Sequence, residues 1–430
     1  MIPTRREALS GLAGAFGGLG LAGLAAAQNA APVSPRRSAF SVSVTGFGAK
    51  GDGQTDDAPA FKKALEAAGQ AGGAVVLVPP GRFRLTTPLE VHNNVTLEGV
   101  HRSSPPNTAS GSVLLADVPP GDENGKPFLT LHNHSTLAGL SVLYSQQNDP
   151  GAIKPFPWCV RGVADNASIV NCLLVNPYMA VDFGTVTGGR HYIDGLYGQP
   201  LYRGLYIDTC FDVGRVRNVH FWPFWNQEKA RGFMETKGEA FIIGRTDWQF
   251  IDSCFCIWYR VGFHFVANKH GPGNVLVTNS GSDIGPVAVQ VDQVQGHSGV
   301  SFVNGQFMSG VEVSEANTGP VKFTASGFWG VQERGIFCSS HAMLAGSGPV
   351  SFDGCHFTMW DIEKKGAPAI DANCKALAIR GCDFVDADRR QIRLGSAVES
   401  AIITGNRLRG GQKIETPAGK QFTIGLNSEA

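Results

Sequence analysis

The chain has 430 residues, of which 43% are hydrophobic and 17% are charged, so it carries enough apolar surface for a packed core and is not intrinsically disordered. Its 36 basic and 36 acidic residues balance, which argues against a nucleic-acid partner. Glycine occupies 55 positions, a share typical of many turns and small stacked residues and not of a coiled coil.

Residues 1–27 are predicted to be an export signal. Arg5 and Arg6 precede an uncharged stretch that begins at Leu9 and ends in three alanines at Ala27. This order is typical of a signal peptide, and the arginine pair resembles the twin-arginine type. An ordinary secretory signal and an uncleaved anchor are the alternatives, but a stretch so rich in glycine and alanine makes a poor membrane span.

The rest of the chain is predicted to be a linker followed by one domain. Residues 28–39 are rich in alanine, proline and serine, a composition typical of a flexible linker. Residues 40–430 contain no further apolar run long enough to cross a membrane. We therefore expect an exported protein, periplasmic or extracellular, that makes no contact with the membrane once the signal is removed.

A helix is predicted near the start of this domain, over residues 55–68. Thr55 is expected to cap its first turn, because a threonine hydroxyl can accept a hydrogen bond from the backbone N–H groups there. An apolar stripe on one helical face would pack against the domain. The stripe consists of Phe61, Ala64, Leu65 and Ala68.

From residue 160 onward one short pattern returns: alternating apolar residues, a small or amide residue, and then an aromatic or leucine. Five copies end at Phe307, Phe328, Phe357, Phe384 and Leu408, which are 21, 29, 27 and 24 residues apart. A period of roughly 25 residues with alternation in each unit predicts an all-β solenoid of stacked coils, whose open N-terminal end the helix would cover. Propeller blades would need about 40 residues per repeat.

A second strand is predicted after each copy of this first strand. Alternation points Leu205 and Ile207 toward the interior and Tyr206 and Asp208 toward the outside. The second strands are expected at residues 204–208, 240–243, 262–265, 287–291, 310–313 and 335–338.

The chain contains nine cysteines, and cysteines in an exported protein favour disulfides on general grounds. Their number is odd, and Cys172, Cys254, Cys355 and Cys382 recur at equivalent places in the repeat. We therefore favour buried thiols that pack as small hydrophobic residues, with disulfides as the alternative. No cysteines and histidines have the spacing of a zinc site, and no metal or other cofactor is expected.

Three segments, Phe47–Asp57, Gly72–Phe83 and Asn94–Gly99, together resemble the opening of the pectate-lyase-like superfamily, which includes polygalacturonases, rhamnogalacturonases and some phage tail-spikes. The resemblance implies a right-handed parallel β-helix with a short N-terminal capping helix. It also implies a pectin-like or other acidic or complex polysaccharide as substrate. The polygalacturonase motifs Asn-Thr-Asp, Gly-Asp-Asp, Gly-His-Gly and Arg-Ile-Lys are absent, so that catalytic set cannot be carried over.

The turns that lead from first to second strands are rich in aromatic and charged residues. Stacked coils would align them in a groove, where sugar rings pack on aromatic faces and charged groups bind the hydroxyls. The alternatives are rings folded onto the core and an interface in a homo-oligomer. The predicted substrate-binding residues are Tyr202, Arg203, Trp222, Trp225, Trp258, Tyr259, Arg260, Trp329, Arg334 and Trp360.

Glu239 is the predicted catalytic carboxylate, because its place directly before a second strand resembles that of the family's Gly-Asp-Asp motif, although only one acid is present here. Hydrolysis of a glycosidic bond needs two carboxyl groups, and Glu235, Asp247 and Glu333 are the candidate partners. We therefore predict a glycoside hydrolase.

Two other functions stay open. One is a polysaccharide lyase that uses Arg260, Lys269, His264 or His270 beside a uronate, and only this enzyme would use calcium. The other is a non-catalytic β-helix that binds glycans.

Overall fold

The computed structural model describes residues 41–101, 109–148, 153–223, 227–330, 332–333, 336–337 and 339–429. The predicted signal at 1–27 and the predicted linker at 28–39 lie outside these ranges, so both stay predictions. Within the same ranges, every helix is too short or too polar to cross a bilayer.

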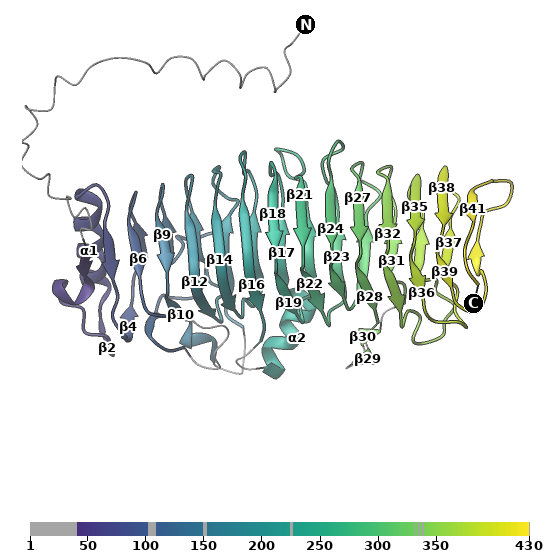
Figure 1. The fold of residues 1–430 in the computed structure, drawn as a ribbon. Coiled ribbons are helices and arrows are strands. Elements are labelled where there is room, and N and C mark those ends of the chain that lie inside the picture. Colours follow the sequence, from purple (N-terminus) through teal and green to yellow (C-terminus); the bar gives the residue numbers. More distant parts are fainter. Residues whose placement is uncertain are drawn as a thin grey trace, which may run out of the picture. The chain divides into compact units, whose positions relative to one another are not determined.

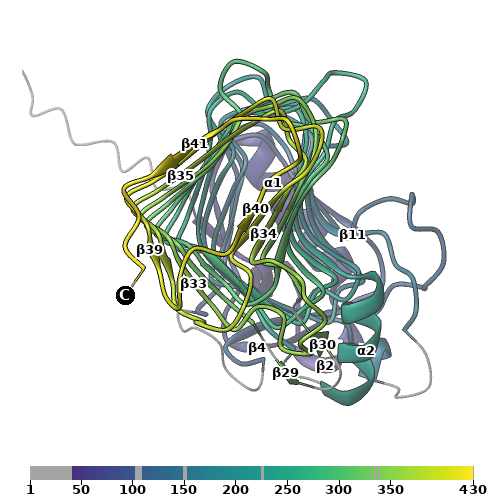
Figure 2. The same ribbon diagram turned by 90° about the vertical axis from the view of Figure 1, so that its right-hand side faces the viewer.

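The described residues form a right-handed parallel β-helix, as the repeat and the resemblance predict (Figure 1). Apart from one short hairpin, each described strand pairs in parallel with the corresponding strand of a neighbouring coil. For example, β17 (Glu239–Ile243) pairs with β20 (Val261–Phe265), which pairs with β23 (Val287–Val291). Parallel partners need a crossover between them, and the remainder of each coil provides it. Viewed along the axis, three strand stacks surround one interior (Figure 2).

One of these stacks is a sheet of its own, sheet B, and the candidate site lies on its outer face. In the described part of the chain it has 13 strands. They are β5 (Leu89–Val91), β8 (Leu129–Leu131), β11 (Trp158–Gly162), β13 (Met179–Phe183), β15 (Arg203–Ile207), β17, β20, β23, β26 (Gly310–Val313), β31 (Ala342–Leu344), β34 (Ile370–Ala372), β37 (Ile392–Leu394) and β40 (Ile414–Glu415).

The other two stacks form sheet A, because three long strands belong to both: β12 (Ser168–Val175), β14 (Tyr192–Gly198) and β16 (Arg215–Phe221). The first stack adds β1 (Ser41–Ser43), β3 (Val75–Leu77), β6 (Thr96–Glu98), β9 (Thr136–Ala138), β18 (Gln249–Asp252), β21 (Val275–Thr278), β24 (Val300–Val303), β27 (Val321–Thr324), β32 (Val350–Asp353), β35 (Ala376–Arg380), β38 (Ser400–Thr404) and β41 (Thr423–Gly425). The second stack adds β2 (Asp52–Asp56), β4 (Gly81–Leu85), β7 (Ser112–Ala116), β10 (Ser141–Leu143), β19 (Phe255–Ile257), β22 (Gly281–Asp283), β25 (Gln306–Phe307), β28 (Gly327–Trp329), β33 (His356–Thr358), β36 (Asp383–Phe384) and β39 (Arg407–Leu408).

A few short elements lie outside the stacks. They are the helices α1 (Ala58–Gln70) and α2 (Gln227–Lys237), the 3₁₀ helices η1 (Val44–Phe47) and η2 (Ser145–Asn148), and a hairpin of β29 (Gln332–Glu333) and β30 (Ile336–Phe337). Helix α1 covers the N-terminal end of the β-helix (Figure 1). The apolar stripe predicted for it is confirmed as buried: Phe61, Ala64, Leu65 and Ala68.

The N-cap predicted for α1 is wrong. The helix begins at Ala58 with Asp57 as its N-cap, and Thr55 lies in strand β2. Pro59 explains the later start, because proline suits the first helical turn, where its missing N–H group is not needed. The carboxylate of Asp57 accepts the backbone N–H of Lys50 at 2.7 Å, so it ties the preceding loop to the helix.

Five of the six predicted second strands are confirmed, as β15, β17, β20, β23 and β26. The strand predicted at 335–338 is wrong. Ile336 and Phe337 instead pair antiparallel with Glu333 and Gln332, and β31 supplies the sheet B strand of this coil. A run of four alternating residues fits a hairpin as well as a stacked strand, so the local pattern could not separate them.

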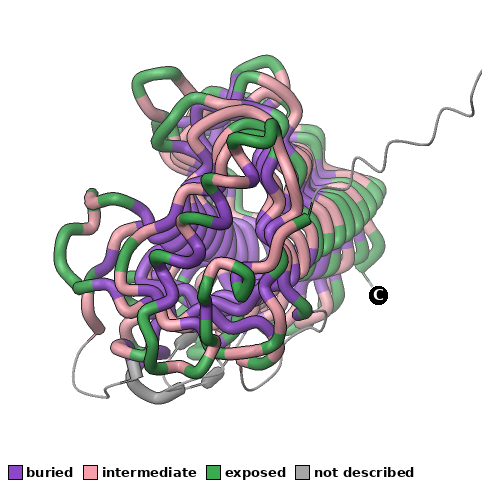
Figure 3. Tube along the Cα trace, turned by 90° about the vertical axis from the view of Figure 1, so that its left-hand side faces the viewer, coloured by how far each residue is buried: buried purple, intermediate pink, exposed green. Residues whose placement is uncertain are grey.

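Aromatic rings stack along the interior. Phe241 and Phe263 have ring centroids 4.8 Å apart and an interplanar angle of 9°, and Phe357 and Phe384 are 4.7 Å apart at 8°. Parallel pairing places each ring one strand spacing, about 4.8 Å, above the last. Figure 3 shows the buried residues inside the coils and the exposed ones at the outer turns.

The cysteines pack in the same way. All eight cysteines whose surroundings are described are buried and form no disulfide, which confirms the prediction for them, while Cys338 lies outside the described part. They are Cys159, Cys172, Cys210, Cys254, Cys256, Cys355, Cys374 and Cys382.

Candidate active site

The outer face of sheet B carries a cluster of charged side chains on three neighbouring strands. Glu239 opens β17, Arg260 directly precedes β20, His264 lies within β20, and Asp292 directly follows β23. Because the parallel register stacks corresponding positions of successive coils, side chains that are distant in the sequence meet on one surface.

His264 joins two carboxylates. Its Nδ1 lies 3.2 Å from Oε1 of Glu239, and its Nε2 lies 2.9 Å from Oδ2 of Asp292. Burial alone would lower the pKa of His264, but the hydrogen bonds with Asp292 and Glu239 outweigh it and raise the pKa to about 9. Near neutral pH the ring is therefore an imidazolium that donates one N–H to each carboxylate.

Glu239 has a second cationic partner in Arg260, whose guanidinium forms an ion pair with the same carboxylate oxygen. Burial would raise the pKa of the Glu239 carboxyl, but the hydrogen bond with His264 and the charges of His264, Arg260 and Arg203 leave it lowered. Glu239 is therefore ionised near neutral pH. That state suits a carboxylate that positions its neighbours, and it does not suit a proton donor.

Asp292 and Glu312, on neighbouring coils, have opposite electrostatic surroundings. The hydrogen bond from His264 lowers the pKa of the Asp292 carboxyl, against the effect of burial, and Nε2 of Gln290 donates to its Oδ1 at 2.9 Å. Burial raises the pKa of Glu312, and the charge of Asp292 adds to this rise, while Arg260 opposes it. Two carboxyl groups whose pKa values are pushed apart in this way are suited to general acid and base roles.

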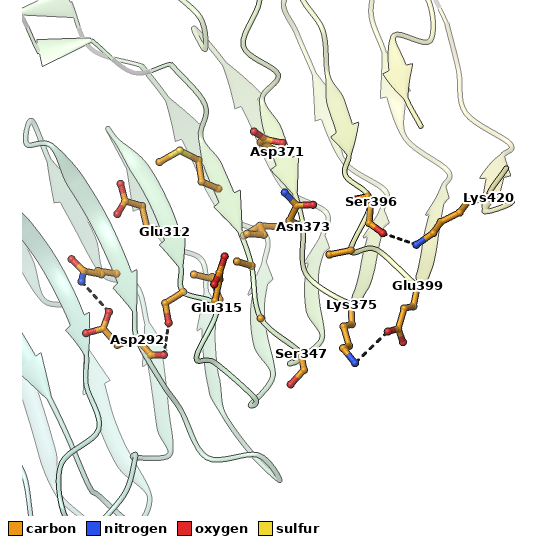
Figure 4. Close-up of a pocket in the computed structure, with 18 residues that line it drawn as sticks. Asp292, Glu312, Glu315, Ser347, Asp371, Asn373, Lys375, Ser396, Glu399 and Lys420 are labelled. Atoms are coloured by element: carbon orange, nitrogen blue, oxygen red, sulfur yellow. Dashed lines mark hydrogen bonds and ion pairs between the residues drawn. The ribbon is translucent and has the colours of Figure 1, made fainter. Parts of the chain in front are cut away.

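A groove of about 890 Å³ begins at Asp292 and continues along sheet B toward the C-terminal coils (Figure 4). Ligand sites in proteins commonly measure about 300–1,000 Å³. A polymer lying in this groove would pass both Asp292 and Glu312. The other polar and charged lining residues are Gln290, Ser314, Glu315, Ser347, Asp371, Asn373, Lys375, Ser396, Glu399 and Lys420.

Five residues predicted from the sequence lie in or beside the cluster, and His264, predicted only for a lyase, is one of them. Glu239 and Arg260 are part of it. Arg203 opens β15 and pairs in register with Glu239, and its guanidinium lies 4.9 Å from the centroid of the Tyr202 ring. The structure therefore brings together residues from the turns before three successive strands, as predicted.

The predicted partners of Glu239 are held elsewhere. Glu235, on α2, pairs with Arg231 at 2.5 Å, and the guanidinium of Arg231 lies 3.8 Å from the centroid of Trp258. Asp247 lies beyond the other end of β17, in the turn toward sheet A, and pairs with Arg245 at 2.6 Å. The side chain of Glu333 lies outside the described part of the chain.

Two predicted sugar-binding aromatics belong to the core instead. Tyr259 is 1% exposed, and its hydroxyl donates to the carbonyl of Pro200 at 2.7 Å. Trp360 is 0% exposed, and its Nε1 donates to the carbonyl of Arg390 at 2.8 Å. A ring whose faces are covered cannot stack on a sugar, so the prediction is wrong for these two residues.

Trp222 and Trp329 stay at the surface, but on the second stack of sheet A. Trp222 directly follows β16 and is 37% exposed. Trp329 ends β28 and lines a separate hollow of about 480 Å³ with Gln306 and Met308. The predicted single groove is therefore divided between two faces. Trp225 and Arg334 lie outside the described residues.

Of the residues predicted for a lyase, only His264 and Arg260 belong to the cluster. Lys269 and His270 are exposed in the turn after β20. No group of three or more histidine, cysteine, aspartate or glutamate residues in the described part could hold a metal ion.

Sequence reasoning missed Asp292 and Glu312. A signal was present, because alternation in the predicted strands at 287–291 and 310–313 points Gln290 and Glu312 outward. That signal is weak, since a solvated surface acid gives the same pattern. The contact with His264 and the burial of Glu312 distinguish these two carboxyls, and both depend on neighbouring coils.

Sequence comparison relates the start of the β-helix to known proteins. Residues 41–154 match the family model described as rhamnogalacturonase A/epimerase, pectate lyase-like. Over 43 residues the chain is 51% identical to alginate lyase 7 of Azotobacter vinelandii, a match that covers 10% of this chain and 5% of that protein. The chain spans less than a tenth of the length of the curated relatives it matches.

Two solved structures share the fold over most of this chain. The N-terminal fragment of gene product 12 of bacteriophage phi29 is 14% identical, with a TM-score of 0.57, over 90% of this chain and 70% of that chain. The A-module of the mannuronan C-5 epimerase AlgE6 of Azotobacter vinelandii is 14% identical, with a TM-score of 0.51, over 90% of this chain and 99% of that chain. At these identities the likeness shows the fold alone.

Proposed function

We propose that this chain, which belongs to the pectate-lyase-like superfamily of right-handed parallel β-helix proteins, is an exported glycoside hydrolase that cleaves a polysaccharide bound in the groove on sheet B. One observation carries the proposal: Asp292 and Glu312 lie at the start of this groove, and their surroundings lower the pKa of the first and raise the pKa of the second. The names of the matched family and of the epimerase relative support a polysaccharide as substrate.

The proposed chemistry needs one protonated and one ionised carboxyl group beside the glycosidic bond. Glu312 donates its proton to the glycosidic oxygen, which leaves as a hydroxyl group. Asp292 either takes a proton from the attacking water or attacks the anomeric carbon itself. The distance between the two carboxyl groups in the substrate complex decides between these two routes.

His264, Gln290 and Glu239 position Asp292 in this proposal. His264 holds one oxygen of Asp292 and Gln290 holds the other, so the carboxylate is kept ionised and fixed in orientation. Glu239 and Arg260 hold His264 from the opposite side. A carboxylate fixed before substrate arrives needs little reorganisation during the reaction.

A polysaccharide lyase is the second candidate, and the cationic groups around Glu239 favour it. Arg203, Arg260 and the His264 imidazolium could receive a uronate carboxylate while a base removes the neighbouring proton. This candidate ranks second because His264 is held protonated by two carboxylates and is not free to act as that base. Calcium would be needed only for the lyase, and the proposed hydrolase needs no cofactor.

Incubation of the full chain with a panel of acidic and neutral glycans tests the proposal. New reducing ends and the ultraviolet absorbance of unsaturated uronates are followed in the same samples. Reducing ends without absorbance support the hydrolase, and both signals together support the lyase. Retention on a glycan column with neither signal would mean a binding protein without catalysis.

Export by residues 1–27 to the periplasm or the cell exterior is part of the same proposal. A variant with both Arg5→Lys and Arg6→Lys is expected to stay in the cytoplasm, because the twin-arginine route depends on that pair. Cell fractionation measures this outcome. Unchanged export of the variant would indicate an ordinary secretory signal.

A further inference from the structure

The charges in the sheet B groove indicate which glycans it can hold; this inference rests on the proposed function. Three carboxyl groups face the start of the groove from two neighbouring coils: Asp292, Glu312 and Glu315 (Figure 4). Glu315 is exposed, and no described basic side chain forms an ion pair with it. Among the described residues that line this end of the groove, acidic side chains are therefore in excess.

The two lysines that line the groove are both engaged. Lys375 Nζ lies 3.2 Å from the carboxylate of Glu399. Lys420 Nζ donates to the backbone carbonyls of Ser396 and Val398, at 2.7 Å each. The lining also carries five acidic side chains, so acids outnumber these two lysines: Asp292, Glu312, Glu315, Asp371 and Glu399.

The remaining cations nearby are also occupied or lie elsewhere. Arg393 is paired with Asp371, whose carboxylate is part of the groove wall. Arg260 pairs with Glu239, and Arg203 lies on the far side of Glu239, outside the groove lining. A polyuronate would therefore carry a carboxylate on every sugar into a groove whose described lining has more acidic than basic side chains.

The rest of the lining suits an uncharged sugar chain. Ser347, Ser396 and Asn373 offer hydroxyl and amide groups to sugar hydroxyls. Met343 is 42% exposed, and its side chain offers an apolar surface to the face of a sugar ring.

We propose that this groove selects glycans that carry no carboxylate groups, and that Glu315 is a residue that excludes polyuronates. Specificity of this kind arises from repulsion of the wrong ligand as much as from attraction of the right one. The inference removes the acidic members from the range of acidic or complex polysaccharides that the sequence resemblance implies.

The test compares each acidic polysaccharide in a panel with its carboxyl-reduced form. The acidic and the reduced polymer differ in charge but share the same sugar backbone and linkages. Binding to the full chain is measured by affinity electrophoresis, and turnover by reducing ends. At least one reduced polymer is expected to bind about 10-fold more tightly than its acidic parent, since like charges in a groove oppose binding.

Variants of Glu315 connect this preference to one residue. Glu315→Gln is expected to reduce the ratio of the affinity for a carboxyl-reduced polymer to the affinity for its acidic parent. Glu315→Lys is expected to reduce this ratio further. Glu66→Lys makes the same charge change on the exposed face of α1, and it should leave the ratio unchanged. An unchanged ratio in both Glu315 variants would overturn the role of this residue.

The outcomes separate this inference from the proposed function. Tighter binding of the acidic parents by the wild-type chain overturns the inference, even if they are hydrolysed. A preference for acidic polymers that appears only with calcium also overturns it, because the carboxylates would then bind the cation. A preference for reduced polymers without turnover keeps the inference and removes the hydrolase. Binding of no polymer overturns the groove as a glycan site.

Discussion

On the outer face of sheet B, Asp182 and Glu312 lie on opposite sides of His264 and have different surroundings. On the N-terminal side, the side chain of Asp182 is 0% exposed and lies 2.5 Å from Arg161, which faces it from the preceding strand. On the C-terminal side, Glu312 has Gln290 and Met343 as its neighbours in register and faces the groove. The same strand position is thus a closed ion pair where a neighbouring coil presents a base, and an open carboxyl where the neighbouring coils present an amide and a thioether.

The largest effect is expected from Glu312→Gln, which removes the proton donor on the open side. Turnover should fall by about 10²–10⁴-fold, as for loss of a general acid, while circular dichroism stays unchanged. Reducing-end assays on a polymer that the wild-type chain cleaves measure the loss. Glu315→Gln, on the same side of the groove, serves as the control and should retain turnover on uncharged polymers. Wild-type turnover by Glu312→Gln would end the assignment.

On the N-terminal side of His264, loss of the buried ion pair between Asp182 and Arg161 should lower the stability of the fold. Asp182→Asn leaves Arg161, only 14% exposed, without its anionic partner, and the free energy of unfolding should fall by about 3–5 kcal/mol. Denaturant unfolding measures it. As a control, Asp353→Asn breaks an exposed ion pair, in which the side chain of Asp353 is 34% exposed and that of Arg380 is 54% exposed. This change should lower the free energy of unfolding by less than about 1 kcal/mol. Equal losses of unfolding free energy in Asp182→Asn and Asp353→Asn would contradict the difference between a buried and an exposed ion pair.

The stability of the fold is expected to depend on pH through His264, which lies between the two sides. The pKa of His264 is raised to about 9 in the fold, above an unfolded value near 6.5. Its stabilising effect is therefore complete below about pH 6.5 and is lost as the pH rises to about 9, on the order of 3 kcal/mol in all. Unfolding of the wild-type chain and of His264→Gln across this range measures it. Parallel curves for the two proteins would show that the imidazolium contributes nothing.

The smallest effect is expected on sheet A. Trp329→Ala should change kcat/KM by about twofold or less, since substitutions away from a site typically alter free energies by about 0.5 kcal/mol or less. Met343→Ala, in the groove, should cause a larger loss. The reverse order would place the substrate path on the face that carries Trp222 and Trp329, close to the groove first predicted from the sequence.

The sequence allowed single residues of the site to be predicted, but not how they are arranged. Glu239 and Arg260 could be named because both lie directly before a second strand, where the predicted edge of the groove is. Tyr259 and Trp360 lie in equivalent turns and point inward, and the turn sequences do not differ in a way that reveals this. The hydroxyl of Tyr259 and the indole N–H of Trp360 each donate to a backbone carbonyl of another coil, a contact that the turn sequence alone does not reveal.

By itself, the sequence determined the coil period, the alternation of inward and outward residues, the buried cysteines and the stripe of α1, because each depends on residues close together in the chain. Only the tertiary structure decided that His264 lies between Glu239 and Asp292, that Asp292 and Glu312 have opposite pKa shifts, and which acids have a base beside them. These features depend on the register of coils twenty or more residues apart, and on the charge and burial that one coil imposes on the next.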